Sequence, residues 1–274
     1  MINKLLGSIS KLTESSVEVA PDICLLQFTV VNVCLVGSSD SWMLVDTALH
    51  HSADFIINTA AEYFGKDNPP QLILLTHGHF DHIGSVLDLA ETWDVPVFAH
   101  EREIPYLTGK KDYPLPDPSA DEGLIAKLSP SFPHRSINLD YRAVALPRDG
   151  RIPGFPEWRW IHTPGHTEGH VSFFRKKDKT LLVGDAFTTT KQESALSVLT
   201  QAEQVKGPPA YFTSDWETAE KSVAKLRALE PELAIPSHGL PLKGKELTAH
   251  LDRLVRHFKT IAVPDKEKDR QREE

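Results

Sequence analysis

The segment Thr76-His77-Gly78-His79-Phe80-Asp81-His82-Ile83-Gly84 decides the architecture of this chain. It follows a short apolar run at 71–75, typical of a buried strand, and it precedes a helical pattern at 85–92. It therefore places three imidazoles and a carboxylate at the carboxyl end of a strand, where α/β sheets usually carry their functional sites.

Strand and helix patterns alternate outward from this segment, which predicts an α/β fold. The first half contains a β-rich stretch with a turn at 37–40, and the second half repeats a similar order of elements. Predicted strands lie at 23–36, 42–45, 71–75, 95–99, 141–146, 158–162, 170–174, 181–184 and 233–236, and predicted helices at 51–64, 85–92, 215–229 and 245–261.

Three stretches interrupt or end this pattern. Residues 108–135 are rich in proline, with a short helical pattern around 121–128, and we expect a loop or lid there. Residues 187–213 follow a strand and are the expected specificity region. Residues 264–274 are almost entirely charged, which predicts a disordered tail. We therefore expect a single domain over residues 1–263.

Composition and charge exclude several classes of protein. The 274 residues are 40% hydrophobic and 25% charged, unlike a disordered, collagenous or coiled-coil chain. No apolar run approaches the ~20 residues that span a bilayer, and residues 1–12 do not resemble a signal peptide. A net charge of −8 disfavours nucleic acid as a partner, and two cysteines cannot build a disulfide framework. We expect a cytoplasmic protein that acts on a small molecule, with no membrane or nucleic-acid partner.

The histidine-rich segment is best explained as a metal site. Neutral imidazole and carboxylate groups are preferred ligands of zinc and related ions. A solvated histidine-rich turn is the simpler alternative, but it explains neither the preceding strand nor the flanking Gly78 and Gly84. The spacing therefore predicts metal binding.

Four ordered motifs resemble the metallo-β-lactamase superfamily. The first, His77-x-His79-x-Asp81-His82, matches the H-x-H-x-D-H signature of that family. Thr163-Pro164-Gly165-His166-Thr167 resembles the segment with the third histidine, and Gly184-Asp185 the bridging aspartate. Pro236-Ser237-His238-Gly239 resembles the final histidine segment. The resemblance covers residues 15 to 262.

The resemblance implies a fold and a ligand set. The fold would be a four-layer αβ/βα sandwich, with two mixed sheets and helices outside. His77, His79 and His166 would bind one ion, and Asp81, His82 and His238 a second. Asp185 would bridge the two, and Asp46 matches an aspartate that supports the ligands in many members.

The same resemblance implies a hydrolase that uses two zinc ions, with iron or manganese as other possible metals. Metal-bound hydroxide, oriented by Asp81, would attack the carbonyl of a carboxylic ester, lactone, thioester or amide. Phe80, Thr188 and Tyr211 are candidate substrate contacts, although ordinary packing also explains each of them. Lactonases of this family often have a tyrosine at the position of Thr188.

Two other functions remain open at this point. Persulfide dioxygenases share the first motif but use a single iron, so the chain resembles an oxidoreductase as well. A catalytically silent metal-binding protein is the third possibility, although silent relatives commonly lose ligands that this chain keeps. The sequence does not set the oligomeric state.

Overall fold

The computed structural model describes residues 14–120, 123–190 and 205–268 of the chain. The chain divides into two compact units. Unit 1 comprises Met1–Tyr113 and Pro133–Leu146, and unit 2 comprises Pro114–Phe132 and Pro147–Glu274. Each unit is described by itself below.

Unit 1 is built on a mixed sheet whose strands follow one another in sequence order. The first four strands pair antiparallel, and the last four, from β4 onward, pair parallel. Among the described residues, the sheet consists of β1 (Ser15–Ala20), β2 (Ile23–Gln27), β3 (Asn32–Ser38), β4 (Ser41–Val45), β5 (Leu72–Leu74), β6 (Val97–Ala99) and β7 (Ala143–Ala145).

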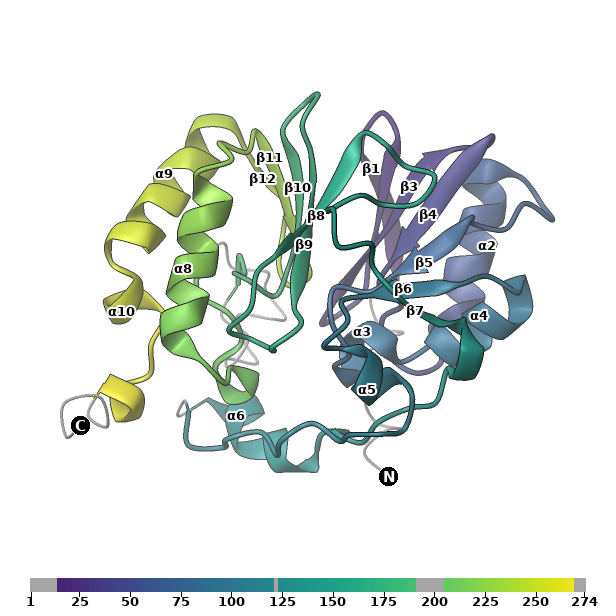
Figure 1. The fold of residues 1–274 in the computed structure, drawn as a ribbon. Helices are drawn as coiled ribbons and strands as arrows, with labels where there is room; N and C mark the ends of the chain where they lie inside the picture. The colour runs from purple at the N-terminus through teal and green to yellow at the C-terminus, as the bar shows by residue number, and fades with distance from the viewer. Residues whose placement is uncertain (1–13, 121–122, 191–204, 269–274) are drawn as a thin grey trace. The chain divides into compact units, whose positions relative to one another are not determined.

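The helices of unit 1 connect its parallel strands, because a parallel pair needs a crossover. They are α2 (Ala53–Phe64), α3 (Phe80–Ile83), α4 (Val86–Trp93), α5 (Ile104–Leu107) and the 3-10 turn η3 (Asp140–Arg142). Ile56 of α2 and Leu89 of α4 are fully buried and share one apolar core with the sheet residues Leu44 and Ile73. Figure 1 shows α2 and α4 beside this sheet.

Unit 2 has a smaller mixed sheet, in the order β12-β11-β10-β9-β8. β10 and β11 are parallel, and the other neighbours are antiparallel. The strands are β8 (Trp158–His162), β9 (Val171–Arg175), β10 (Thr180–Gly184), β11 (Leu233–Pro236) and β12 (Leu242–Lys243).

Two long helices cover the sheet of unit 2. These are α8 (Trp216–Arg227) and α9 (Gly244–Arg256), and Figure 1 shows them side by side. Val223 and Leu251 pack in one apolar core with Leu181 and Ala234 of the sheet. The shorter helical elements are α6 (Leu124–Leu128), η2 (Ser129–Ser131), η4 (Ala210–Phe212) and α10 (Phe258–Ile261).

The predicted fold class is confirmed, since the structure has two mixed sheets with helices. One helix prediction is wrong: the stretch 245–261 breaks at His257, whose non-helical backbone, with a φ of −125°, separates α9 from α10. Pro264–Lys268, within the predicted tail, form a helical turn, since the amides of Glu267 and Lys268 donate to the carbonyl of Pro264. Residues 191–204 of the predicted specificity region lie outside the described residues.

Two smaller sequence expectations can be compared with the structure. Cys24 and Cys34 are free and buried, in line with core thiols. No helix within the described ranges is long and apolar enough to cross a membrane.

Candidate metal centre

The histidine-rich segment of unit 1 connects β5 to α3, as the sequence predicts. Asp46 follows the neighbouring parallel strand β4, and its amide donates to the carbonyl of Leu74 at 2.8 Å. The carboxyl ends of β4 and β5 therefore bring Asp46 beside the histidines. We call His77, His79, Asp81 and His82 the unit 1 cluster.

The carboxylate of Asp46 holds the start and the end of this cluster together. It accepts hydrogen bonds from the amide and the hydroxyl of Thr76, both at 2.8 Å. Its Oδ2 lies 2.9 Å from Nδ1 of His82. Such a contact keeps the proton on Nδ1 and directs the Nε2 lone pair away from the carboxylate, as the partners of metal-binding histidines do.

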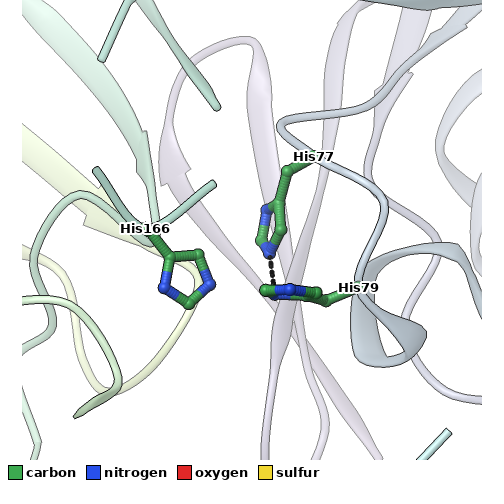
Figure 2. A group of neighbouring side chains, drawn as sticks. All are labelled: His77, His79 and His166. Carbon is green, nitrogen blue, oxygen red and sulfur yellow. Dashed lines mark hydrogen bonds between the residues drawn. The ribbon is translucent and has the colours of Figure 1, made fainter. Parts of the chain in front are cut away.

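The three imidazoles of the unit 1 cluster are buried and in contact. Nε2 of His77 lies 2.9 Å from Nδ1 of His79, and Figure 2 shows this hydrogen bond. The rings of His77 and His82 are 4.1 Å apart between centroids, and Oδ1 of Asp81 is 3.9 Å from Nε2 of His82. Three buried imidazoles and a carboxylate thus gather within one turn.

The backbone of Gly78 is held by two buried side chains, Glu103 and Tyr113. Its amide donates to Oε2 of Glu103 and to the hydroxyl of Tyr113, each at 3.0 Å, and the Tyr113 hydroxyl donates to Glu103. Burial, and then the neighbouring Glu103 carboxylate, raises the pKa of the Tyr113 phenol well above its ordinary value. These contacts fix the backbone between His77 and His79.

Unit 2 brings together three residues that are far apart in the sequence: His166, Asp185 and His238, which we call the unit 2 cluster. Asp185 and His238 follow β10 and β11, and because these strands are parallel, their carboxyl ends meet at one edge. His166, the third histidine labelled in Figure 2, lies in the loop between β8 and β9.

Asp185 lies between the two histidines of its cluster. Its Oδ2 is 3.3 Å from Nε2 of His166, and its Oδ1 is 3.3 Å from Nε2 of His238. All three side chains are almost completely buried. One carboxylate therefore directs a different oxygen at each of two imidazole nitrogens.

His170 fixes the backbone of Asp185. The amide of Asp185 donates to Nε2 of His170 at 2.8 Å, so that nitrogen must be unprotonated. Nδ1 of the same ring lies 3.1 Å from the carbonyl oxygen of Thr163, to which it can donate. Both contacts require the neutral ring with its proton on Nδ1. The sequence alone could place His170 near the site but could not show this contact.

The His166 loop is anchored at the start of α8. The carbonyl of Gly165 accepts from the amides of Ser214 and Asp215, and Asp215 caps the helix by accepting from the amide of Thr218 at 2.9 Å. Burial raises the pKa of the Asp215 carboxyl, but the hydrogen bonds from Thr218 outweigh it, and the pKa lies below its ordinary value. Gly165 has a φ of +129°, and a Cβ there would lie 2.4 Å from the amide nitrogen of Ala219.

The three candidate substrate contacts have different environments. Phe80 is half-buried at the start of α3. Thr188 is buried, and its hydroxyl donates to the carbonyl of Thr190 at 2.8 Å, although the residue also lines a cavity of about 810 Å³ in unit 2. Tyr211 is buried against Phe132 and Phe212. Of the three, Phe80 alone sits within a cluster of predicted ligands along the chain.

Comparisons with known proteins agree with this arrangement of motifs. Residues 26–238 match the family model of the Metallo-beta-lactamase superfamily. The chain is 45% identical over 247 residues to the probable metallo-hydrolase YflN of Bacillus subtilis (strain 168), covering 89% of this chain and 94% of that protein. It is 31% identical over 209 residues to the probable metallo-hydrolase YybB of the same strain, with 76% and 80% covered.

A solved structure extends the comparison to the fold. The crystal structure of BLEG-1 B3 metallo-beta-lactamase matches with a TM-score of 0.58 at 21% sequence identity, covering 90% of this chain and 100% of that chain. The family model, the similar sequences and the shared fold lead to one conclusion. This chain belongs to the metallo-β-lactamase superfamily, and the relatives that it resembles support a metal-dependent hydrolase.

Proposed function

We propose that the chain is a dinuclear zinc hydrolase to which the unit 1 and unit 2 clusters each contribute ligands. In this assignment His77, His79 and His166 hold one ion, while Asp81, His82 and His238 hold the other. Asp185 would bridge the two ions. The substrate is a small carboxylic ester, lactone, thioester or amide.

The position of Asp185 carries this proposal. A carboxylate that bridges two ions must offer one oxygen to each, beside another ligand of each ion. Asp185 has this arrangement within unit 2, where its two oxygens are 3.3 Å from His166 and 3.3 Å from His238. A carboxylate that merely accepted hydrogen bonds in a core would not need two imidazole partners on opposite oxygens.

The donor types fit zinc. All seven residues are histidine or aspartate, which zinc accepts as ligands, and they also suit iron and manganese. Ions bound there would supply Lewis acidity, which polarises a carbonyl and lowers the pKa of a bound water to about 7. Their charge would exceed that of the two aspartates, which favours an anionic transition state.

The chain's own groups have separate tasks in this proposal. Asp46 orients His82 through Nδ1, and His170 orients the backbone of Asp185. The Asp81 side chain is 13% exposed, so its carboxylate is accessible to accept a hydrogen bond from the attacking water and orient it. No nucleophilic side chain is needed.

The Asp185→Asn variant tests the proposal. The protein, purified without chelator, is assayed against a lactone, a thioester, a p-nitrophenyl ester and a β-lactam. We expect hydrolysis of at least one, and a loss of kcat/KM of about 10³-fold or more in Asp185→Asn, beyond the 10- to 100-fold typical of residues that only support a ligand. An amide cannot offer two anionic oxygens.

The matched control is Asp88→Asn, on the exposed surface of α4, which should leave kcat/KM unchanged. Full activity in Asp185→Asn would refute the bridging role. Oxygen uptake with a thiol persulfide, in place of any hydrolysis, would overturn the hydrolase and support the iron oxidoreductase.

A further inference from the structure

A cavity of about 180 Å³ lies in unit 1 beside the histidine-rich segment. Its lining includes Gly78 and Phe80, and Phe80 lies between His79 and Asp81 in the chain. A molecule in this cavity therefore touches the same loop that carries the proposed metal ligands. Apolar side chains of the lining also include Leu49, Ile83, Leu87 and Ile137.

Tyr113 contributes the face of its ring to the lining of the cavity, rather than a free hydrogen-bonding group. Its hydroxyl is already engaged with Glu103 and the amide of Gly78. Its ring is stacked on Tyr106, with 3.9 Å between centroids and 6° between planes. This part of the lining is therefore held in place and is suited to contact with an apolar group.

Besides Tyr113, three polar side chains belong to the lining: His50, His134 and Arg135. The Nδ1 atom of His50 lies 3.0 Å from the carbonyl oxygen of Gly84, and Arg135 is exposed to solvent. Leu87, at the start of α4, leaves 44% of its surface exposed beside the cavity. A ligand in the cavity would bury part of this leucine surface.

We propose that this cavity, which we call the Phe80 pocket, binds the apolar acyl chain or ring of the substrate. An apolar cavity of about 150 Å³ is known to accept benzene, so the Phe80 pocket suits a group of about six carbons. The proposal rests on the proposed function, because it assigns the pocket to the substrate of the same centre. It narrows the substrate class to acyl compounds with a medium-sized apolar group.

Two measurements test the pocket on the full-length purified protein. The first is the ratio of kcat/KM for p-nitrophenyl hexanoate to that for p-nitrophenyl acetate. Each buried methylene raises affinity by up to about fourfold, so we expect a ratio of at least about tenfold. The second is binding of 1-hexanol against ethanol by ligand-observed NMR, which needs no hydrolysis.

The variant Leu87→Trp fills the pocket, and Leu128→Trp is its matched control, since Leu128 is a similarly exposed leucine of unit 2. We expect Leu87→Trp to bring the ester ratio below about twofold and to abolish hexanol binding, with no change in Leu128→Trp. Leu87→Arg, which places a charge at the same rim, should act in the same way.

The outcomes separate the two proposals. Hydrolysis without a chain-length preference, or a preference that survives both Leu87 variants, would overturn the Phe80 pocket and leave the hydrolase standing. Hexanol binding that Leu87→Trp abolishes, with no ester hydrolysed, would count against the proposed function and so against the pocket as a substrate site.

Discussion

The unit 1 and unit 2 clusters both gather histidine and aspartate side chains, but they do so in different ways. Unit 1 gathers His77, His79, Asp81 and His82 from one loop of contiguous sequence after a single strand. Unit 2 gathers its three residues from three loops, and its geometry depends on the parallel pairing of β10 with β11. The first cluster is a local motif, and the second is a product of topology.

The supporting contacts act at different points of the two clusters. In unit 1 Asp46 contacts the ring of His82, beside the contacts that hold the backbone amide of Gly78. In unit 2 His170 holds the backbone amide of Asp185. Replacing Asp46 should weaken one proposed ligand, whereas replacing His170 should move the loop that carries Asp185.

Among the residues that support the proposed ligands, Asp46→Asn should have the largest effect. The amide retains volume but loses the charge that holds the proton on Nδ1 of His82, so metal affinity should fall by about 10- to 100-fold. Competition with a chromophoric chelator measures this loss, and Asp88→Asn serves as the control. Because His82 is the one proposed ligand in direct contact with the Asp46 carboxylate, one of the two ions should be lost first. An equal loss of affinity for both ions would contradict a role of Asp46 that acts through His82.

A smaller effect, about tenfold in metal affinity, is expected for His170→Leu, which removes the acceptor for the amide of Asp185. Because Asp185 is the proposed bridge, both ions should weaken together. His170→Gln should restore most of the affinity, since its Oε1 can accept from the same amide. If Gln were no better than Leu, the histidine would serve packing alone.

The smallest effect concerns folding. Gly165→Ala puts a methyl group 2.4 Å from the amide of Ala219, whereas Gly244, also at positive φ, has open space around the same position. The free energy of unfolding in urea should fall by about 1 kcal/mol more in Gly165→Ala than in Gly244→Ala. Equal losses would show that the close approach is relieved by small shifts and that α8 does not hold the His166 loop.

This contrast also explains which parts of the site could be predicted. The unit 1 cluster is visible in the sequence, because its spacing within one turn is itself the signal. The unit 2 residues could be named only through resemblance, since nothing local connects His166 with His238. Glu103 could not be found at all: it is a single acid before a four-residue helix, and its burial depends on contacts with Gly78 and Tyr113.

The fold was predictable where periodicity was strong. Helices α2, α4 and α8 and most of the buried strands agree with the patterns to within a few residues. The predicted strand 23–36 is wrong, because the chain turns at 28–31, where the amide of Phe28 donates to the carbonyl of Val31, and forms the two strands β2 and β3. The sequence analysis missed β1, whose residues are mostly exposed, and β12, which has two residues. It also predicted one helix in place of α9 and α10, because the apolar pattern continues through His257 while the helical backbone ends there.

The metal content of the purified protein is the most direct test of the proposed dinuclear site. Inductively coupled plasma mass spectrometry of protein purified without added metal or chelator should give two divalent ions per chain, predominantly zinc. His79→Ala and His238→Ala, one from each cluster, should each lower that content, and His250→Gln in α9 should not. Unchanged content in both cluster variants, or no metal in the wild-type chain, would contradict the account.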